Sequence, residues 1–287
     1  MLTVESTRCF RAGVYLSGSV FNSVLVIFKP SQKCIETARK TSDYLRRLGV
    51  EVETIWVDDF FRLESRSFPL IVLVGGDGTF LRFSRLTNGG SPLILPIPCG
   101  RRLAFYEEIP LGELESYIDR VFHGDFYIEH LPRVKARVEK MELNALNEVL
   151  VANIDQGRVG SFKLTIHTPS TSTEVSVDCD GVIVGPSPGS SAYNLSARGP
   201  LIESTYPSIF INFLNSLQLN LAPVILPFLS RVRVEAATIS SLYIDGDRIT
   251  TIHDVPVEVS ASWEWLRVIR FNTPRRGLFS VFAKRAL

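Results

Sequence analysis

The chain has 287 residues, and its 31 Lys and Arg nearly balance its 30 Asp and Glu, so the formal net charge is only +1. That balance argues against a general nucleic-acid binder, whose phosphate contacts need a strongly basic surface. Hydrophobic residues make up 45% of the chain, enough apolar side chain to bury a large core, which excludes intrinsic disorder. The longest apolar stretch, residues 221–229, holds two prolines and falls well short of the roughly 20 residues that cross a bilayer.

The cysteines and the N-terminal sequence are the features that bear on cellular location. Cys9, Cys34, Cys99 and Cys179 lie far apart without a CxxC pair, which indicates neither a disulfide framework nor a structural zinc site. We therefore expect four reduced, mostly buried thiols in a cytoplasmic protein. No clean secretory signal opens the chain, although a weak organelle-targeting interpretation stays open.

The first third of the chain alternates predicted strands with a predicted helix. Residues 23–28 form an apolar run typical of a parallel strand buried on both faces, and 34–48 place apolar or small residues on one helical face. Further strands are expected at 50–57, 70–74 and 92–97. This βαβ order predicts a parallel sheet with helices on its faces.

The pattern changes after about residue 110. One more helix is expected over 111–121, and beyond it apolar and polar residues alternate, as in 134–138 and 162–167. Such alternation means strands with one solvent-exposed face and predicts an antiparallel β domain. The last residues, 277–287, are expected to form a short helix.

The first candidate site directly follows the strand expected at 70–74 and consists of Gly75, Gly76, Asp77, Gly78 and Thr79. Open α/β sheets bind ligands at strand ends, where glycines let the backbone approach a phosphate and helix N–H groups favour an anion. A fixed carboxylate at this place can accept a proton from an alcohol. The alternative is a structural turn in which glycine supplies a positive φ and Asp77 caps the helix.

The second candidate is the loop 180–196, which is dense in Gly, Pro and Ser and presents hydroxyl and N–H groups to a polar ligand. The alternative is a plain surface loop. Its residues 185–189 match the G-x-S-x-G pattern of serine hydrolases. However, the residue after Ser187 is Pro188, which lacks the backbone N–H that an oxyanion hole needs. A serine hydrolase is therefore excluded.

The third candidate is the pair Asn147 and Glu148, which interrupts the apolar segment 146–151. On a strand the two side chains would point in opposite directions, so that one faces a cleft. The alternative is an ordinary polar pair at a strand end. The chain contains neither a Walker A loop nor GxGxxG, so the phosphates of any nucleotide must be held in another way.

Together the three segments resemble the NAD kinase family, which has a GGDGT-type motif, an Asn-Glu pair and a long D-G…S-T-P-T-G-S-T-A-Y loop in this order. The resemblance spans about residues 24–250. It implies an α/β N-terminal domain with a parallel sheet at 1–110, onto which 265–287 pack back. It also implies an all-β, sandwich-like C-terminal domain at 111–264, with the active site in the interdomain cleft.

The resemblance further implies a transferase that phosphorylates the 2′-hydroxyl of the adenosine ribose of NAD with ATP and Mg²⁺, giving NADP. Asp77 would be the catalytic base, and Arg82 would join the glycines and Thr79 in holding phosphates, unless it is only a surface cation. No metal ligands from the protein are implied, and the chain would form a dimer or tetramer. The residues implied to bind NAD are Gly78, Asn147, Glu148, Asp180, Ser191, Ala192, Tyr193, Asn194 and Ser196.

Some residues depart from the family pattern and leave alternatives open. Gly185 replaces a usual Ser, Arg198 a usual Gly, and Phe228 a common His. These departures motivate a second hypothesis, a catalytically weak NAD-binding sensor. A lipid kinase of the diacylglycerol kinase type also combines GGDGT with a β domain, but the 180–196 loop and the Asn-Glu pair argue against it.

Overall fold

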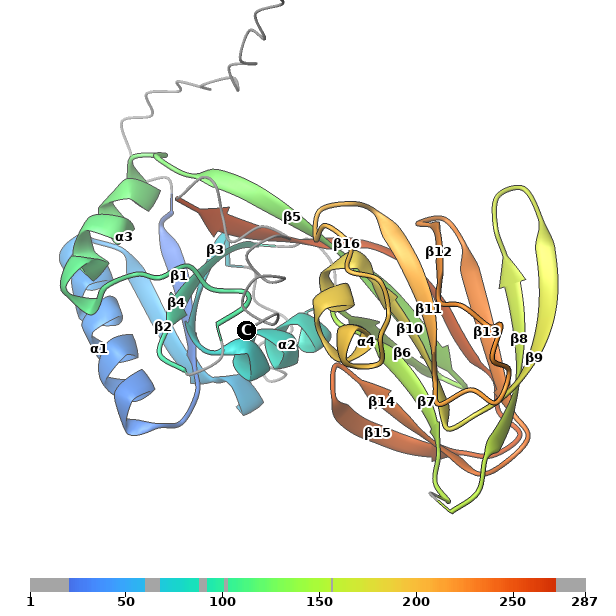
Figure 1. The fold of residues 1–287 in the computed structure, drawn as a ribbon. Helices are drawn as coiled ribbons and strands as arrows, with labels where there is room; N and C mark the ends of the chain where they lie inside the picture. Colours follow the sequence, from blue (N-terminus) through green and yellow to red (C-terminus); the bar gives the residue numbers. More distant parts are fainter. Residues whose placement is uncertain (1–20, 60–67, 88–91, 101–102, 156, 272–287) are drawn as a thin grey trace, which may run out of the picture.

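The computed structural model describes residues 21–59, 68–87, 92–100, 103–155 and 157–271. They form an α/β unit and a β-rich unit, and two long strands, β5 and β16, run from one unit into the other (Figure 1). In this part of the chain no helix is long and apolar enough to cross a membrane.

The N-terminal unit has a parallel sheet in the order β2-β1-β3-β4, as the sequence predicts. Its core continues on both faces of the sheet. On β1, Val24 and Val26 pack with residues of α1 and α3, whereas Leu25 and Ile27 pack with residues of α2. Its elements are β1 (Ser23–Phe28), α1 (Gln32–Arg47), β2 (Glu51–Trp56), β3 (Leu70–Gly75), α2 (Asp77–Leu86), β4 (Leu93–Pro98), η2 (Leu111–Glu113) and α3 (Leu114–Phe122).

The C-terminal unit is antiparallel and contains two layers of strands. One layer has the order β12-β11-β10-β7-β14-β15, and the other combines β16, β13, β8 and β9 with β5 and β6. Both layers contribute to a single core, as the sandwich-like prediction requires. Its elements are β5 (Tyr127–Val138), β6 (Met141–Ala145), β7 (Val149–Asn153), β8 (Gly160–His167), β9 (Ser172–Cys179), β10 (Gly181–Pro186), η3 (Ser187–Ser191), α4 (Tyr193–Ser196), β11 (Ser208–Leu214), β12 (Val224–Pro227), β13 (Arg231–Ala236), β14 (Ser240–Ile244), β15 (Asp247–Ile252) and β16 (Val257–Arg270).

The two units share one continuous sheet. Near its end, β16 pairs in parallel with β4 through Arg267 and Val268, and along its length it pairs with β5 in antiparallel fashion. The chain beyond residue 264 thus returns to the first unit as far as it is described. The helix predicted at 277–287 lies outside the described residues. The division at residue 110 stays a prediction, and α3 packs on α1 in the first unit.

The prediction of four reduced thiols is wrong, because Cys34 and Cys99 form a disulfide with their Cα atoms 5.5 Å apart. Cys34 lies in the first turn of α1, which follows β1, and Cys99 follows β4. The carboxyl ends of parallel strands meet at one edge of the sheet, so the fold brings together residues separated by 65 positions. Nothing in the spacing of the cysteines indicates this pairing. Cys179 is buried and free.

Candidate functional site

Asp77 is the first residue of α2 and lies where β3 ends at the sheet edge. The helix is capped by Gly76 without a side-chain hydrogen bond, so the structure does not use Asp77 as a cap. Instead, Oδ1 of Asp77 accepts a hydrogen bond from the backbone N–H of Phe105 at 3.2 Å. The half-buried carboxylate is therefore held from outside its own helix.

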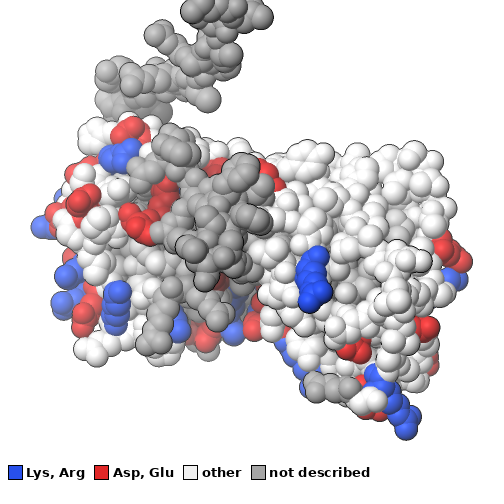
Figure 2. Space-filling view, in the orientation of Figure 1, with Lys and Arg blue, Asp and Glu red and all other residues white. Residues whose placement is uncertain are grey.

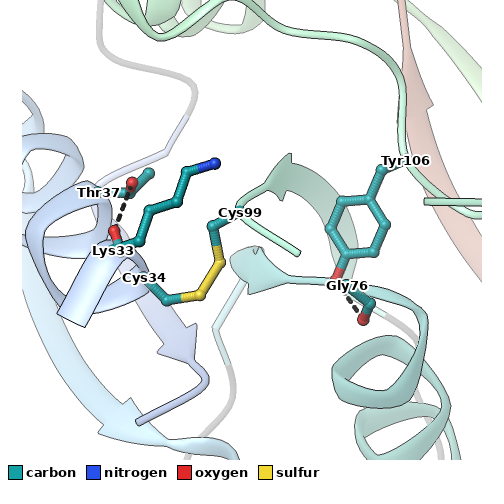
Figure 3. The surroundings of a disulfide bond; sticks show 6 residues. All are labelled: Lys33, Cys34, Thr37, Gly76, Cys99 and Tyr106. Atoms are coloured by element: carbon teal, nitrogen blue, oxygen red, sulfur yellow. Dashed lines mark hydrogen bonds between the residues drawn. A yellow bond between two sulfur atoms is a disulfide. The ribbon is translucent and has the colours of Figure 1, made fainter. Parts of the chain in front are cut away.

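The segment after β4 supports this loop at several points. The N–H groups of Cys99 and Gly100 both donate to the carbonyl of Gly75, and the hydroxyl of Tyr106 donates to the carbonyl of Gly76. Figure 3 shows the Cys34–Cys99 disulfide beside Gly76 and the ring of Tyr106. Burial raises the pKa of the Tyr106 hydroxyl well above its ordinary value, and the charge of Asp77 adds to the shift. Tyr106 therefore acts here as a neutral hydrogen-bond donor.

Asn147 and Glu148 lie in a tight turn between β6 and β7 rather than on a strand. Asp245 holds this turn, because its carboxylate accepts hydrogen bonds from the backbone N–H groups of Leu146, Asn147 and Glu148 at 2.6–3.2 Å. Asp245 and Gly246 both have positive φ, as a two-residue turn between β14 and β15 demands. Burial raises the pKa of Asp245 to about 6, against the lowering effect of the three backbone donors.

Glu148 is a buried carboxyl, with only 5% of its surface exposed. Burial and, to a smaller extent, the nearby charge of Asp245 raise its pKa to about 8, against the lowering effect of the backbone N–H of Tyr193. Its Oε2 has no hydrogen-bond partner among the described residues. A buried polar oxygen without a partner is costly, so this atom is a candidate ligand-binding group.

The loop 180–196 packs directly on the Asn147 turn. A Cβ atom on Gly189 would lie 1.6 Å from the carbonyl oxygen of Asn147, and one on Gly185 would lie 2.4 Å from it. Only glycine permits this approach of two backbones. Ser187 is fully buried and donates its hydroxyl to the carbonyl of Tyr206, so its side chain holds the loop. The segment is ordered as η3 and α4 rather than being a plain surface loop.

The two halves of the site meet where α2 contacts β6 of the C-terminal unit, and Figure 1 shows α2 at the side of its own unit that faces the β-rich unit. Leu146, next to the Asn147 turn, belongs to the same buried cluster as Phe80 and Phe105 beside Asp77. Arg85 of α2 donates to the carbonyl of Ile244 at 2.9 Å and pairs with Asp247 across the junction. The predicted base and the predicted NAD-binding turn therefore lie on one continuous piece of structure.

Arg133 joins α2 to the second unit through hydrogen bonds. Arg133 is buried on β5 and donates to the carbonyls of Ser84 and Thr87 at the end of α2 and of Glu264 on β16. Burial lowers its pKa to about 10, while the charges of Glu264 and Asp245 raise it.

Several predicted site residues lie away from this junction or are otherwise engaged. Asp180 stands at the opposite end of β10 from η3, and a six-residue strand spans roughly 20 Å. Its carboxylate accepts a hydrogen bond from Asn215 at 2.8 Å. Arg82 pairs with Asp58 at 2.7 Å, and the N–H of Thr79 donates to Gly76 inside the helix.

The remaining predicted residues divide into exposed and buried ones. Tyr193 is 43% exposed, so it is not a packed core aromatic, and Ser196 is also exposed. Ser191 and Ala192 are partly buried, and Gly78 is exposed, with open space where a Cβ would be. Asn194 is fully buried, and its amide donates to the carbonyls of Ser190 and Pro200, so it holds the loop together.

Sequence reasoning assigned no structural role to the groups that hold the site. For Asp245, the signal is the Asp-Gly dipeptide between two predicted strands, which marks a tight hairpin turn. Phe105, Tyr106 and Arg270 gave no such signal, because they act through long-range contacts. Arg270, at the end of β16, donates to the carbonyl of Phe105 at 2.9 Å.

Comparison with known families agrees with this architecture. The ATP-NAD kinase N-terminal domain model matches residues 12–126, and the ATP-NAD kinase C-terminal domain model matches residues 146–271. The chain belongs to the NAD kinase family. A member from Thermococcus sibiricus is 27% identical over 262 residues, which cover 86% of this chain and 93% of the relative.

Two solved structures show the NAD kinase fold. A crystal structure of an NAD kinase from Archaeoglobus fulgidus in complex with ATP has a TM-score of 0.73 at 24% identity and covers 92% of this chain and 99% of its own. The crystal structure of yeast NADH kinase complexed with NADH has a TM-score of 0.78 at 16% identity and covers 88% and 84%. At these identities the likeness establishes the two-domain fold.

The structure shows the surroundings of the three residues that depart from the NAD kinase pattern. Gly185 lies against Asn147, so the position has no room for a side chain without a shift of the backbone. Arg198 has a φ of +60°, in the left-handed region where glycine is the favoured residue. Phe228 is buried and packs edge-to-face against Trp263 and Trp265. None of the three departures removes a carboxyl group of the site.

Proposed function

We propose that this chain is an ATP-dependent NAD kinase, which transfers the γ-phosphate of ATP to the 2′-hydroxyl of the adenosine ribose of NAD. One observation carries the proposal: Asp77, at the start of α2, shares a junction with the turn that presents Asn147 and Glu148. The membership of the family supports it. That membership also argues against the lipid kinase alternative.

In this mechanism Asp77 accepts the proton of the ribose hydroxyl as the oxygen attacks the γ-phosphate. The hydroxyl is a poor nucleophile at neutral pH, so a positioned base contributes about 10²- to 10⁴-fold. Glu148, whose Oε2 has no partner in the described part of the chain, would receive a ribose hydroxyl of NAD together with Asn147. Tyr193, exposed beside them, would cover a flat ring of the nucleotide.

Mg²⁺ would enter with ATP rather than bind to a site built by the protein. Among the described residues no three His, Cys, Asp or Glu side chains gather into a metal site. Mg²⁺ bound to a triphosphate takes most of its ligands from phosphate oxygens and water, so the proposal assigns it no ligand from the protein and keeps Asp77 as the base. When bound, the ion neutralises charge on the transferred phosphoryl group.

The test is to incubate the protein with ATP, Mg²⁺ and NAD and to couple the product to an NADP-specific dehydrogenase. We expect turnover that falls about 10²- to 10⁴-fold in Asp77→Asn, while NAD binding by calorimetry is retained. NADH, polyphosphate and other triphosphates are tested alongside, because the acceptor and donor preferences are part of the proposal. Wild-type protein that binds NAD without turnover with any donor would support the sensor hypothesis instead.

A homo-oligomer, dimer or tetramer, is also part of this proposal. The strand β12 forms an edge of its sheet, and its Val224 and Ile225 are 40% and 46% exposed. Figure 2 shows few charged side chains on the face that the β-rich unit turns to the viewer. Light scattering should give a mass of two or four chains, and Ile225→Lys should lower it, because charged residues on an edge strand oppose pairing. A monomeric wild type contradicts this part.

The predicted cytoplasmic location belongs to the proposal as well. The Cys34–Cys99 disulfide argues against this location, because disulfides are uncommon in cytosolic proteins outside hyperthermophiles.

A further inference from the structure

Residues 105–107 form a short strap between the Asp77 loop and the last described strand, β16. Toward the loop, Phe105 donates its N–H to Asp77, and Tyr106 donates its hydroxyl to Gly76. Toward β16, Phe105 accepts a hydrogen bond from Arg270, and Glu107 accepts one from the N–H of Phe271. The strap therefore connects the proposed base to β16.

Within this strap, the backbone of Phe105 links Arg270 and Asp77 through two hydrogen bonds. Its carbonyl accepts from Nη1 of Arg270 at 2.9 Å, and its N–H donates to Oδ1 of Asp77 at 3.2 Å. The ring of Phe105 stacks on Phe80 of α2 with centroids 4.9 Å apart, which restrains the backbone from a third side. The contacts with Arg270 and Phe80 therefore restrain Phe105, whose N–H is the group that contacts the carboxylate of Asp77.

Arg270 has hydrogen-bond partners for Nε and Nη1, whereas its Nη2 has none among the described residues. Its side chain is completely buried, and Nε donates to Oε2 of Glu129 on β5 at 2.9 Å. Burial lowers its pKa to about 10, so it remains a cation at neutral pH. Burying an arginine is costly unless it is paired and hydrogen-bonded, and here one of its donors is directed to a backbone carbonyl next to the proposed base.

We propose that Arg270 is a positioning residue for phosphoryl transfer, which holds Asp77 in place through the Phe105 backbone. This inference rests on the proposed function, because it assigns Arg270 to the reaction in which Asp77 is the base. Arg270 is completely buried, so in this proposal it acts through Phe105 rather than on the substrate. A carboxylate that is loosened by about 1 Å can lose about 10²-fold in rate, so the expected effect falls on kcat.

The deciding variant is the double substitution Glu129→Leu/Arg270→Met. Breaking a buried ion pair on one side strands a charge, but replacing both partners by apolar residues of similar volume is often neutral for stability. We expect a Tm close to that of the wild type and a kcat lower by about 10- to 100-fold, with a much smaller change in the KM for NAD. Hydrogen exchange should show faster exchange of the Phe105 amide.

The matched control is Glu129→Gln, which keeps an acceptor for Nε and leaves the contact between Arg270 and Phe105 in place. It should lower the Tm while retaining kcat. Arg270→Lys keeps one cation for the Phe105 carbonyl and should recover part of the kcat lost in the double variant. A structural role for Arg270 would instead make kcat follow the Tm across all three variants.

The outcomes separate the two proposals. Turnover by the wild type, together with an unchanged kcat or unchanged Phe105 exchange in the double variant, overturns the role of Arg270 and leaves the NAD kinase proposal intact. Absence of turnover in the wild type overturns both, because no reaction remains for Arg270 to serve. A selective loss of kcat with faster exchange of Phe105 supports the positioning role.

Discussion

Asp77 and Glu148 are carboxyl groups of the same proposed site, but the molecule surrounds them differently. Asp77 is half-buried at the start of a helix, beside the exposed Gly78, and is held by a hydrogen bond from the distant Phe105. Glu148 is buried in a turn whose backbone is fixed by Asp245 and covered by the glycines of a second loop.

The difference suits the two regions to different roles in the proposed reaction. The region of Asp77 leaves its carboxylate accessible and steadies it from outside, as proton transfer to a reacting group requires. The region of Glu148 is packed backbone against backbone, which suits the binding and orientation of a rigid ligand. The region of Asp77 is held by individual hydrogen bonds and a disulfide, each of which can be removed by one substitution. The region of Glu148 is held by close backbone packing.

Removing the Cys34–Cys99 disulfide tests how the Asp77 region is held in place. We expect this change to have the largest effect on stability of those considered. Closing a loop of 65 residues lowers the entropy of the unfolded chain and stabilises the fold by about 4 kcal/mol. Reduction should therefore lower the Tm substantially. It should also lower turnover, because Cys99 and Gly100 donate to the Gly75 carbonyl beside Asp77.

Cys34→Ser is the control for this experiment. It should reproduce the Tm of the reduced protein and should no longer respond to a dithiol reductant. If oxidised and reduced wild-type protein melt at the same temperature, Cys34 and Cys99 do not stabilise the fold as a pair.

Gly189→Ala tests the packing of the second region. The added Cβ would overlap the carbonyl oxygen of Asn147, so the two backbones must separate. Overpacking of this kind destabilises by about 1–3 kcal/mol, and NAD affinity measured by calorimetry should fall with it. In Gly112→Ala, where the new Cβ meets no atom within 4 Å, both quantities should stay at their wild-type values. Tight NAD binding by Gly189→Ala would show that the region tolerates expansion.

Glu148→Gln sharpens the comparison through pH and has the smallest expected effect. Burial raises the pKa of Glu148 from 4.5 to about 8. A group with a raised pKa contributes stability below its unfolded pKa, and that contribution is lost as the pH rises through the folded pKa. The glutamine stays neutral, so its variant should melt above the wild type beyond pH 8 and near the wild type around pH 5.

Thermal melts across this pH range measure the difference directly. Glu51→Gln, at an exposed position on β2, should differ from the wild type by the same amount at both ends of the range. A gap for Glu148→Gln that does not widen with pH would mean that Glu148 is ionised in the folded protein.

Local patterns in the chain were sufficient to predict the main elements. The apolar run at β1, the spacing of apolar residues in α1 and the alternation in β8 each reflect burial on one or two faces, which a strand or helix displays in its own sequence. The exclusion of Ser187 as a nucleophile was equally local, because it followed from the proline beside it. Gly49, with a φ of +81°, follows the C-cap of α1 at the position where glycine is favoured.

Residues that act across the fold could not be found in this way. The pairing of Cys34 with Cys99 depends on the parallel order of β1, β3 and β4, and the predicted reduced state was therefore wrong. Asp180 is close in sequence to η3, yet β10 separates the two. Because a strand rises by about 3.3 Å per residue, the two ends of a six-residue strand lie far apart. A single sequence motif that contains β10 therefore occupies two separate places in the fold.

The amino-acid sequence by itself determined the α/β and β units and the glycine-rich turn after β3, because these are properties of neighbouring residues. The tertiary structure decided which carboxyl is accessible and which is buried, and which distant groups hold each one. Burial and long-range hydrogen bonds depend on how the sheets join, and only the complete fold brings Phe105 and Arg270 to Asp77 and Asp245 to Glu148.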